Sequence, residues 1–208
     1  MKILIVFPTT LEAERFSYSH TQHNIKVFIS GIACYNTLYK LTKECITYKP
    51  DLIIHAGIAG AFSNELAITS VVSVVEDCFA DVGVNTKDDF STIFDLGLAH
   101  ENDFPFTSGT LKLPQTGIHS IVPPVKGVTV NSITADTARR EFLEKKFSPQ
   151  VESMEGAAVH FICLQESIPC VHFRGISNYV GDRNKQNWDI QNTLTQIHKT
   201  INEYISLV

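Results

Sequence analysis

Long hydrophobic runs and an excess of positive charge are both missing from this chain. No apolar segment is long enough to span a bilayer, and the run after Lys2 turns polar at Thr9, too early for the hydrophobic region of a signal peptide. The 17 Lys and Arg residues are outnumbered by 22 Asp and Glu, so the formal net charge is -5, whereas nucleic-acid binding favours a basic face. We expect a cytoplasmic protein that engages neither a membrane nor nucleic acid.

Motifs for metals and common cofactors are also absent. The five cysteines are scattered without a CxxC pair, and their odd number suits reduced, buried thiols. The His, Asp and Glu residues show no metal-ligand spacing, and neither G-x-G-x-x-G nor a phosphate loop with its Lys-Ser/Thr pair occurs. We therefore expect no metal and no cofactor.

The chain does have the composition and the alternation of an α/β domain. With 44% hydrophobic and 19% charged residues and no internal repeat, it fits one domain over residues 1–208. Strands are expected over residues 2–7, 25–30, 51–55, 67–80, 107–111, 119–122, 126–133 and 170–176, and helices over 11–17, 35–48, 136–147, 156–167 and 188–207, with 81–101 as loop and some helix. The fold class is predicted as α/β: a single-domain, three-layer α/β/α arrangement with a central mixed sheet.

A pocket is expected around residues 151–159. This segment, VESMEGAAV, places Glu155 at a strand end before small residues that open a helix, and the next buried strand delivers Ser177 and Asn178. Because two neighbouring elements converge there, they make a credible ligand site.

Glu12 follows the first strand and has two interpretations. Thr10 is expected to cap the helix that begins at Leu11, which puts Glu12 and Glu14 in its first turns, where the helix dipole favours carboxylates. Alternatively, Glu12 belongs to a ligand site, because ligands of α/β proteins collect at the carboxyl ends of strands. The local sequence leaves both interpretations open.

The segment over residues 56–62, AGIAGAF, follows the third strand and is expected to form a turn of small residues. Such a turn lets a ligand approach the backbone. It serves equally well as a purely structural connection.

Three segments together resemble the superfamily of purine nucleoside phosphorylases and nucleosidases. They are residues 7–12, residues 56–60, and residues 154–158 with 174–178, in matching order and spacing across nearly the whole chain. Within the superfamily the chain looks most similar to the futalosine-hydrolysing nucleosidases of menaquinone biosynthesis, through residues 80–83, 94–98 and 177–183 followed by Trp188-Asp189. The resemblance implies a nucleoside phosphorylase-like fold, a small-molecule nucleoside substrate and a homo-oligomer, a dimer or larger.

The resemblance also implies roles for individual residues. Glu155 matches the acid that binds the ribose hydroxyls and favours the oxocarbenium-like transition state. Glu12 matches the acid that activates the attacking water, and Glu14 ranks second because it is offset from the match. Met154 is expected either to pack on the sugar or base or to belong to the core. The other expected substrate-binding residues are Gly57, Ile58, Ala59 and Ser177.

Asn178 departs from the aspartate that the adenine-cleaving nucleosidases carry here. An amide cannot release a proton at ordinary pH, but it can donate a hydrogen bond to N7 or to O6 of a 6-oxopurine. It can also bridge N6 and N7 of adenine. Hypoxanthine departs more readily as an anion than adenine, which favours an inosine-like substrate such as futalosine, with Asn178 as the catalytic hydrogen-bond donor.

Water is the expected nucleophile, because Ile58 cannot donate to a phosphate oxygen and the chain has only five arginines. The expected reaction is therefore hydrolysis of futalosine to hypoxanthine and dehypoxanthine futalosine. The alternatives are a methylthioadenosine/S-adenosylhomocysteine or aminodeoxyfutalosine nucleosidase, a purine nucleoside phosphorylase, and a nucleoside-binding or storage protein without catalysis.

Other polar residues have simpler expectations. Asp182 and Arg183 are expected in a solvated or lid-like loop, with contact to the substrate's distal carboxylate as the alternative. The role of Glu152 stays open, because relatives carry an acid directly before the Met. Three histidines in apolar segments are expected to be hydrogen-bonded core residues: His55, His160 and His172.

Overall fold

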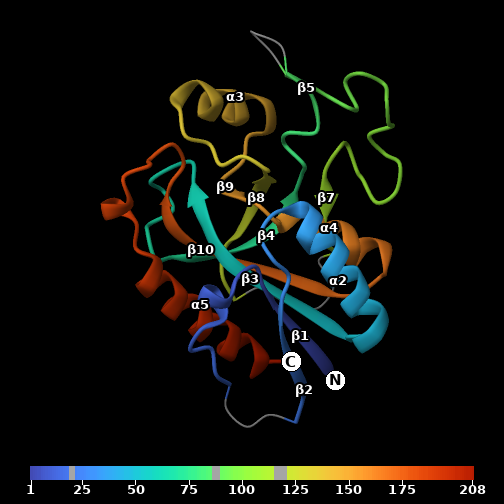
Figure 1. Cartoon of the computed structure of the whole chain (residues 1–208), viewed down its shortest axis with the longest axis vertical. Coiled ribbons are helices and arrows are strands. Elements are labelled where there is room, and N and C mark those ends of the chain that lie inside the picture. Colours follow the sequence, from blue (N-terminus) through green and yellow to red (C-terminus); the bar gives the residue numbers. More distant parts are fainter. Residues whose placement is uncertain (19–21, 86–89, 115–120) are drawn as a thin grey trace.

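A computed structural model describes the chain except for residues 19–21, 86–89 and 115–120. Within the described residues, eight strands form one mixed sheet and two more form a small hairpin (Figure 1). The sheet strands are β1 Lys2–Phe7, β2 Asn24–Ile29, β3 Leu52–Ala61, β4 Val71–Asp77, β7 Leu111–Lys112, β8 Pro124–Thr129, β9 Val151–Ser153 and β10 Cys170–Tyr179, and the hairpin strands are β5 Gly83–Asn85 and β6 Phe90–Thr92. The helices are α1 Thr10–Ala13, α2 Cys34–Tyr48, α3 Thr137–Phe147, α4 Gly156–Gln165, the short 3-10 helix η1 Lys185–Asn187, and α5 Ile190–Ile205.

The sheet closes on itself around β3. This strand pairs in parallel with β1 and β10 and antiparallel with β9. β10 continues antiparallel to β4, β4 runs parallel to β8, and β8 runs parallel to β9. These pairings form a closed ring, from which β1 and β2 extend as parallel strands. Because β1, β3 and β10 run parallel, their carboxyl ends lie at the same end of the sheet.

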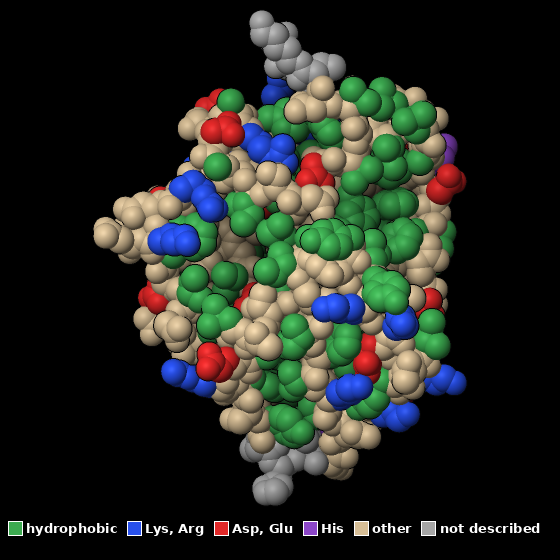
Figure 2. Space-filling model, in the orientation of Figure 1, with side chains coloured by type: hydrophobic (Ala, Val, Ile, Leu, Met, Phe, Trp, Pro, Cys, Tyr) green, Lys and Arg blue, Asp and Glu red, His purple; other side chains and the backbone are tan. Residues whose placement is uncertain are grey.

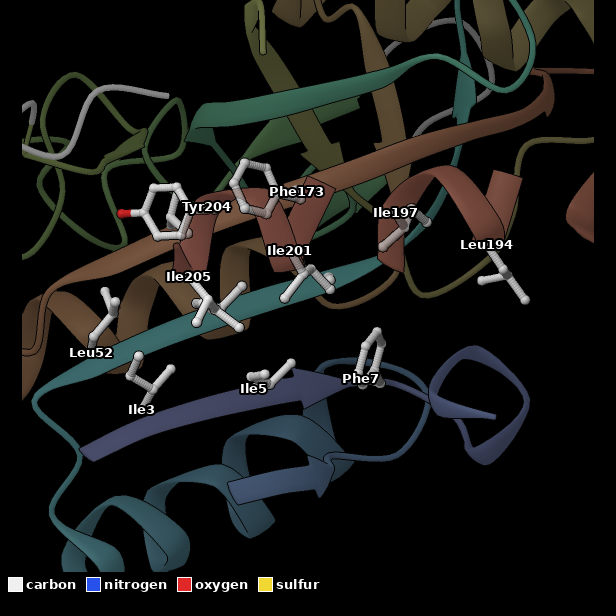
Figure 3. Close-up of a cluster of buried hydrophobic side chains, with 13 residues drawn as sticks. Ile3, Ile5, Phe7, Leu52, Phe173, Leu194, Ile197, Ile201, Tyr204 and Ile205 are labelled. Carbon is white, nitrogen blue, oxygen red and sulfur yellow. The ribbon is translucent and has the colours of Figure 1, made fainter. Parts of the chain in front are cut away.

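Helices cover both faces of the sheet. β1 is buried on both sides after Lys2, so its sequence is a continuous apolar run rather than an alternation. On one face, α5 packs its apolar stripe against alternate residues of β1, β3 and β10 (Figure 3). On the other face, α2 and α4 pack together against the remaining residues of β1 and β3. The predicted three-layer α/β/α arrangement with a mixed sheet is therefore confirmed.

The small residues after the third strand do not form the expected turn. Residues 56–61 continue β3, which pairs with β10 through Ala61 and with β9 at Gly60 and Ala61. Small residues do not end a strand when both neighbouring strands supply hydrogen bonds. Their small size instead leaves room for side chains from α1 and β10 beside the strand.

Other expected elements differ in extent. The strand predicted over residues 67–80 begins only at Val71, because Ser70 closes a turn by donating to the Ala67 carbonyl. The described part of residues 81–101 contains β5, β6 and turns but no helix. Of the strand predicted over residues 119–122, residues 119 and 120 lie outside the described residues, and Ile121 and Val122 are not in a strand.

The surface mixes charged and apolar side chains (Figure 2). Large exposed hydrophobic residues include Tyr35, Tyr39, Leu98 and Phe104. Across the described ranges, none of the helices is both long and apolar enough to cross a membrane. Exposed apolar residues of this kind are common on globular proteins.

Candidate active site

A cavity of about 240 Å³ opens at the carboxyl ends of β1, β3 and β10. Ligands of parallel α/β sheets bind at this end of the strands. Seven of the eight predicted site residues line it: Glu12, Ile58, Ala59, Met154, Glu155, Ser177 and Asn178. Glu14, the competing acid, is exposed and lies outside this lining. The cavity is therefore the candidate active site.

Glu12 is held by the cap of its own helix and by β3. Thr9, not the expected Thr10, is the N-cap of α1, and its Oγ1 accepts the N–H of Glu12 at 3.2 Å. The cap lies one residue earlier because the Thr9-x-x-Glu12 spacing fits a capping box. Thr9 Oγ1 donates in turn to Glu12 Oε2 at 2.6 Å, and Ile58 N–H donates to Oε1 at 3.1 Å. Both carboxylate oxygens are thus fixed, and each keeps a free lone pair.

Gly57 lies behind the cavity wall rather than in its lining. A Cβ at this position would lie 2.3 Å from Arg174 Nη1 and 2.8 Å from Glu12 Oε1. The missing side chain therefore lets an acid from α1 and a cation from β10 approach the same point of β3. The prediction that Gly57 contacts the substrate stays a prediction.

Glu155 follows β9 at the N-terminus of α4 and is 4% exposed. Its Oε1 accepts the N–H of Ala33 at 3.0 Å, and its Oε2 lies 3.5 Å from Arg174 Nη2. Burial raises the pKa of Glu155, while the Arg174 guanidinium opposes this rise. Ala33 has φ 70, a conformation that residues with side chains rarely adopt. The strained backbone aims its N–H at the acid.

Arg174 is the centre of a buried hydrogen-bond network and is 1% exposed. Its Nε donates to His172 Nε2 at 2.7 Å, its Nη1 to the Ile58 carbonyl at 3.3 Å, and its Nη2 lies 3.1 Å from His55 Nε2. His172 Nδ1 lies 3.1 Å from His160 Nε2, and His160 Nδ1 lies 3.1 Å from the Leu111 carbonyl. The Leu111 carbonyl can only accept, so His160 Nδ1 carries the proton of that hydrogen bond. The other hydrogen bonds of this series then run in the same direction, with His172 Nδ1 donating to His160 and Arg174 donating to His172.

This direction requires His160 and His172 to be neutral, and His55 must be neutral as well for its Nε2 to accept from Arg174 Nη2. Burial lowers the pKa of His160 to about 4 and lowers the pKa of His55 and His172 well below the ordinary value, and the Arg174 charge adds to each effect. The rings of His55 and His172 stack with centroids 4.4 Å apart. The expectation of hydrogen-bonded core histidines is confirmed, and Arg174, the partner of His55 and His172, is a residue to which the sequence assigned no role.

Asn178 enters the cavity through a bulge in β10. Ile176 pairs with Ala59 and Asn178 pairs with Gly60, so Ser177 is an extra residue relative to β3. Neighbouring strand residues normally face opposite sides, but the bulge lets both Ser177 and Asn178 line the cavity. Ser177 Oγ donates to Asn178 Oδ1 at 2.8 Å, and Asn178 Nδ2 donates to the Tyr179 carbonyl at 3.1 Å. One N–H of the amide remains for a ligand.

Glu152 and Met154 form another part of the wall. Glu152 accepts from the N–H of Thr134 at 3.0 Å and from its hydroxyl, which ties the segment after β8 to β9. Burial raises the pKa of Glu152, and the Thr134 hydrogen bonds oppose the rise. Met154 is half-buried and lines the cavity, so it lies where it can contact a ligand. The structure thus gives Glu152, whose role the sequence left open, Thr134 as its hydrogen-bond partner in the cavity wall.

The rim consists of the loop between β10 and α5. Asp182 accepts from the Asn184 N–H at 2.9 Å and from Asn187 Nδ2 at 2.8 Å, and its carbonyl accepts from Trp188 Nε1 at 3.0 Å. The Arg183 guanidinium lies 5.3 Å from the centre of the Trp188 ring. Trp188 is the single aromatic residue among the described residues of the lining.

The described residues contain no group of three or more His, Cys, Asp or Glu side chains that could hold a metal ion. The arrangement instead offers two fixed carboxylates and an amide donor at one cavity, with the buried Arg174 behind its wall. Such groups can bind hydroxyls, orient a water molecule and stabilise a positive charge.

Relatives with known names match most of the chain. A futalosine hydrolase from Streptomyces coelicolor is 29% identical over 151 residues, which cover 71% of this chain and 62% of that protein, less than two thirds of its length. A 5'-methylthioadenosine/S-adenosylhomocysteine nucleosidase from Bacillus cereus is 27% identical over 182 residues, which cover 86% of this chain and 78% of that protein.

Solved structures share the fold. The native structure of futalosine hydrolase from Helicobacter pylori aligns over 100% of this chain and 98% of that chain, with a TM-score of 0.80 and 16% identity. The phosphorylase superfamily profile matches residues 7–206. The chain, with its nucleoside phosphorylase-like fold, therefore belongs to the phosphorylase superfamily.

Proposed function

We propose that this protein is a nucleosidase that hydrolyses the N-ribosyl bond of futalosine, releasing hypoxanthine and dehypoxanthine futalosine. The convergence of Glu12, Glu155 and Asn178 on a single cavity carries this proposal. The cleavage passes through an oxocarbenium-like sugar, so it needs an oriented nucleophile, a negative charge near the ribose and help for the departing base. The three residues supply one group for each need.

Glu12 orients the attacking water. Its two oxygens are fixed by Thr9 and Ile58, each keeps a free lone pair, and Glu12 lines the cavity. Glu155 accepts hydrogen bonds from the ribose hydroxyls with the lone pairs that Ala33 does not use. Its negative charge then stabilises the positive charge that develops on the sugar.

Asn178 supports a 6-oxopurine as the base. Its Oδ1 accepts from Ser177 and its Nδ2 donates to the Tyr179 carbonyl, so the amide is held in place and one N–H is left to donate to a ligand. This donor matches N7 and O6 of hypoxanthine, which are both acceptors, whereas the 6-amino group of adenine is itself a donor. An amide also suits a base that leaves without full protonation.

The state of Arg174 supports water over phosphate as the nucleophile. Its donors are already engaged by His172, His55, the Ile58 carbonyl and the Glu155 carboxylate. It therefore has little capacity to clamp a phosphate, for which arginine forks are the usual protein partners. The aliphatic Ile58 side chain adds no donor.

The competing function is a methylthioadenosine/S-adenosylhomocysteine nucleosidase, which the Bacillus cereus relative favours by its name. Base release from futalosine, methylthioadenosine and inosine, each with and without phosphate, separates the candidates. We expect the highest kcat/KM for futalosine and no dependence on phosphate. Faster cleavage of methylthioadenosine would replace the proposed substrate, a phosphate requirement would indicate a phosphorylase, and binding without base release would indicate a storage protein. Location in the cytoplasm and homo-oligomerisation stay predictions, as does a single domain over residues 1–208.

A further inference from the structure

The charged side chains around the cavity are unevenly distributed. Among the described residues, the lining contains four acids, Glu12, Glu152, Glu155 and Asp182, but a single Lys or Arg side chain, that of Arg183. The first three acids are buried in the wall, whereas Arg183 is exposed at the mouth. A ligand that fills the cavity would therefore meet positive charge only at its outer end.

The loop holds Arg183 in place without neutralising it. The carboxylate of the adjacent Asp182 accepts hydrogen bonds from Asn184 and Asn187. The N–H of Asp189 donates to the Ser177 carbonyl at 3.0 Å, which anchors the loop to β10. Arg183 itself forms neither an ion pair nor a side-chain hydrogen bond with any residue that the structure describes. Its guanidinium stacks over the half-buried Trp188 ring instead.

Stacking of this kind orients a guanidinium and leaves its N–H edge free. The planar fork then matches the two oxygens of a carboxylate, which it can bind through two parallel hydrogen bonds. Apolar side chains of the same lining, such as Leu11, Ile32 and Ile190, can cover an aromatic or aliphatic linker between the ribose and that carboxylate.

We propose that Arg183, held over Trp188, binds a carboxylate at the distal end of the substrate and so selects nucleosides with an anionic 5'-side substituent over neutral ones. This inference rests on the proposed function, because the aryl carboxylate of futalosine is such a group. It assigns to the rim a discrimination that Glu12, Glu155 and Asn178 cannot provide, since these residues meet parts that all purine nucleosides share.

The test compares wild type, Arg183→Gln, Arg183→Lys and the control Lys185→Gln. Lys185 is an exposed cation on the same loop that does not line the cavity, so its variant matches the loss of charge. The substrates are futalosine, the methyl ester of its carboxylate, and inosine. We expect Arg183→Gln to raise KM for futalosine about tenfold, with a much smaller change in kcat, as for loss of a charge-assisted hydrogen bond.

In the same variant, the factor by which KM rises for the ester and for inosine should be at least about fivefold smaller than the factor for futalosine. Arg183→Lys should fall between wild type and Arg183→Gln, because it keeps the charge but loses the paired geometry. Lys185→Gln should follow wild type, and added salt should weaken futalosine binding in wild type more than in Arg183→Gln. An equal change for all three substrates, or none for futalosine, would overturn the inference while leaving the proposed function intact.

Failure of the proposed function has a different signature. If wild type releases no hypoxanthine from futalosine, calorimetric binding of futalosine and its ester to wild type and Arg183→Gln decides the inference by itself. Tighter binding of the acid than of the ester, lost in Arg183→Gln, supports the carboxylate site. Equal binding of acid and ester refutes it.

Discussion

Arg174, behind the wall of the cavity, and Arg183, in its lining, are two arginines in opposite environments. Arg174 is 1% exposed and has His55, His172, Ile58 and Glu155 as partners. Arg183 is exposed, and its only side-chain partner among the described residues is the Trp188 ring. One charge is balanced by the fold, whereas the other is left for a ligand.

This difference separates the reaction centre from the part that recognises the substrate. Burying a charge is costly unless it is paired and hydrogen-bonded, so the network around Arg174 must be complete before any ligand binds. A rim charge remains hydrated, so it can be left without a partner at little cost. The reaction centre should therefore respond to mutation through turnover and stability, and the rim through substrate choice.

Glu12→Gln should have the largest effect on turnover. We expect kcat to fall by about 10³- to 10⁴-fold for every substrate, because the carboxylate that orients water is lost. Glutamine can still accept from Ile58 N–H and contact Thr9, so circular dichroism and the melting temperature should change little. Glu14→Gln is the matched control, because that acid is exposed. Near-normal turnover in Glu12→Gln would contradict the assigned role.

Exchanging each arginine for methionine compares the two environments directly. Arg174→Met should lower the free energy of unfolding by about 4 kcal/mol, because it leaves the buried Glu155 carboxylate without its ion pair. Arg183→Met should change it by less than about 0.5 kcal/mol, as for most surface positions. Urea unfolding measures both, and similar losses in the two variants would erase the distinction between centre and rim.

Gly57→Ala should lower both stability and kcat, because it adds one methyl group at the reaction centre. The added Cβ would meet Arg174 Nη1 at 2.3 Å and Glu12 Oε1 at 2.8 Å, so both groups must move. We expect a loss of about 3 kcal/mol in stability together with a large fall in kcat. Gly60→Ala is the milder comparison, because its Cβ would meet Val180 Cγ2 at 3.1 Å and Asn178 Nδ2 at 3.2 Å. Equal activity of the two variants would argue against crowding at Gly57.

Asp77 is a buried acid that forms no ion pair with any described residue, and it should make the stability of the fold depend on pH. It is 1% exposed, its Oδ1 accepts from Thr129 and Cys78, and its Oδ2 has no hydrogen-bond partner among the described residues. Burial raises the pKa of Asp77 from 3.8 to about 7. Between these values the folded protein binds the proton and the unfolded chain does not, so this contribution to stability is present at low pH and is lost as pH rises through about 7.

Asp77→Asn removes this pH dependence and keeps the Oδ1 acceptor. Relative to wild type, the variant should gain about 2 kcal/mol of stability between pH 5.5 and pH 8.5. His160 changes the stability with pH in the opposite direction, because its lowered pKa of about 4 makes the fold less stable as pH falls below 6.5. This contribution is the same in wild type and variant, so it cancels in the difference between them. Urea unfolding at the two pH values gives the difference. A difference that does not change with pH would contradict the raised pKa.

Local patterns predicted the layers of the fold well. The uninterrupted apolar run of β1 indicated a strand covered on both faces, and the helical spacing of apolar residues located α2 and α5. They failed at residues 56–61, where small residues favoured a turn but pairing with β9 and β10 continues the strand. Propensity describes one segment at a time, whereas a strand depends on its neighbours.

The sequence by itself predicted the three layers, most of the elements that build them, and the acids and the amide that line the cavity, because these follow from apolar periodicity and from motif residues that lie close together in the chain. Only the tertiary structure decided how those groups are held. The N–H of Ala33 reaches Glu155 across 122 positions, Arg174 reaches the Ile58 carbonyl across 116, and a bulge in β10 turns Asn178 into the cavity. Such contacts depend on which strands become neighbours, and the loop that holds Arg183 over Trp188 acquires its place beside the cavity only when β10 and α5 are packed.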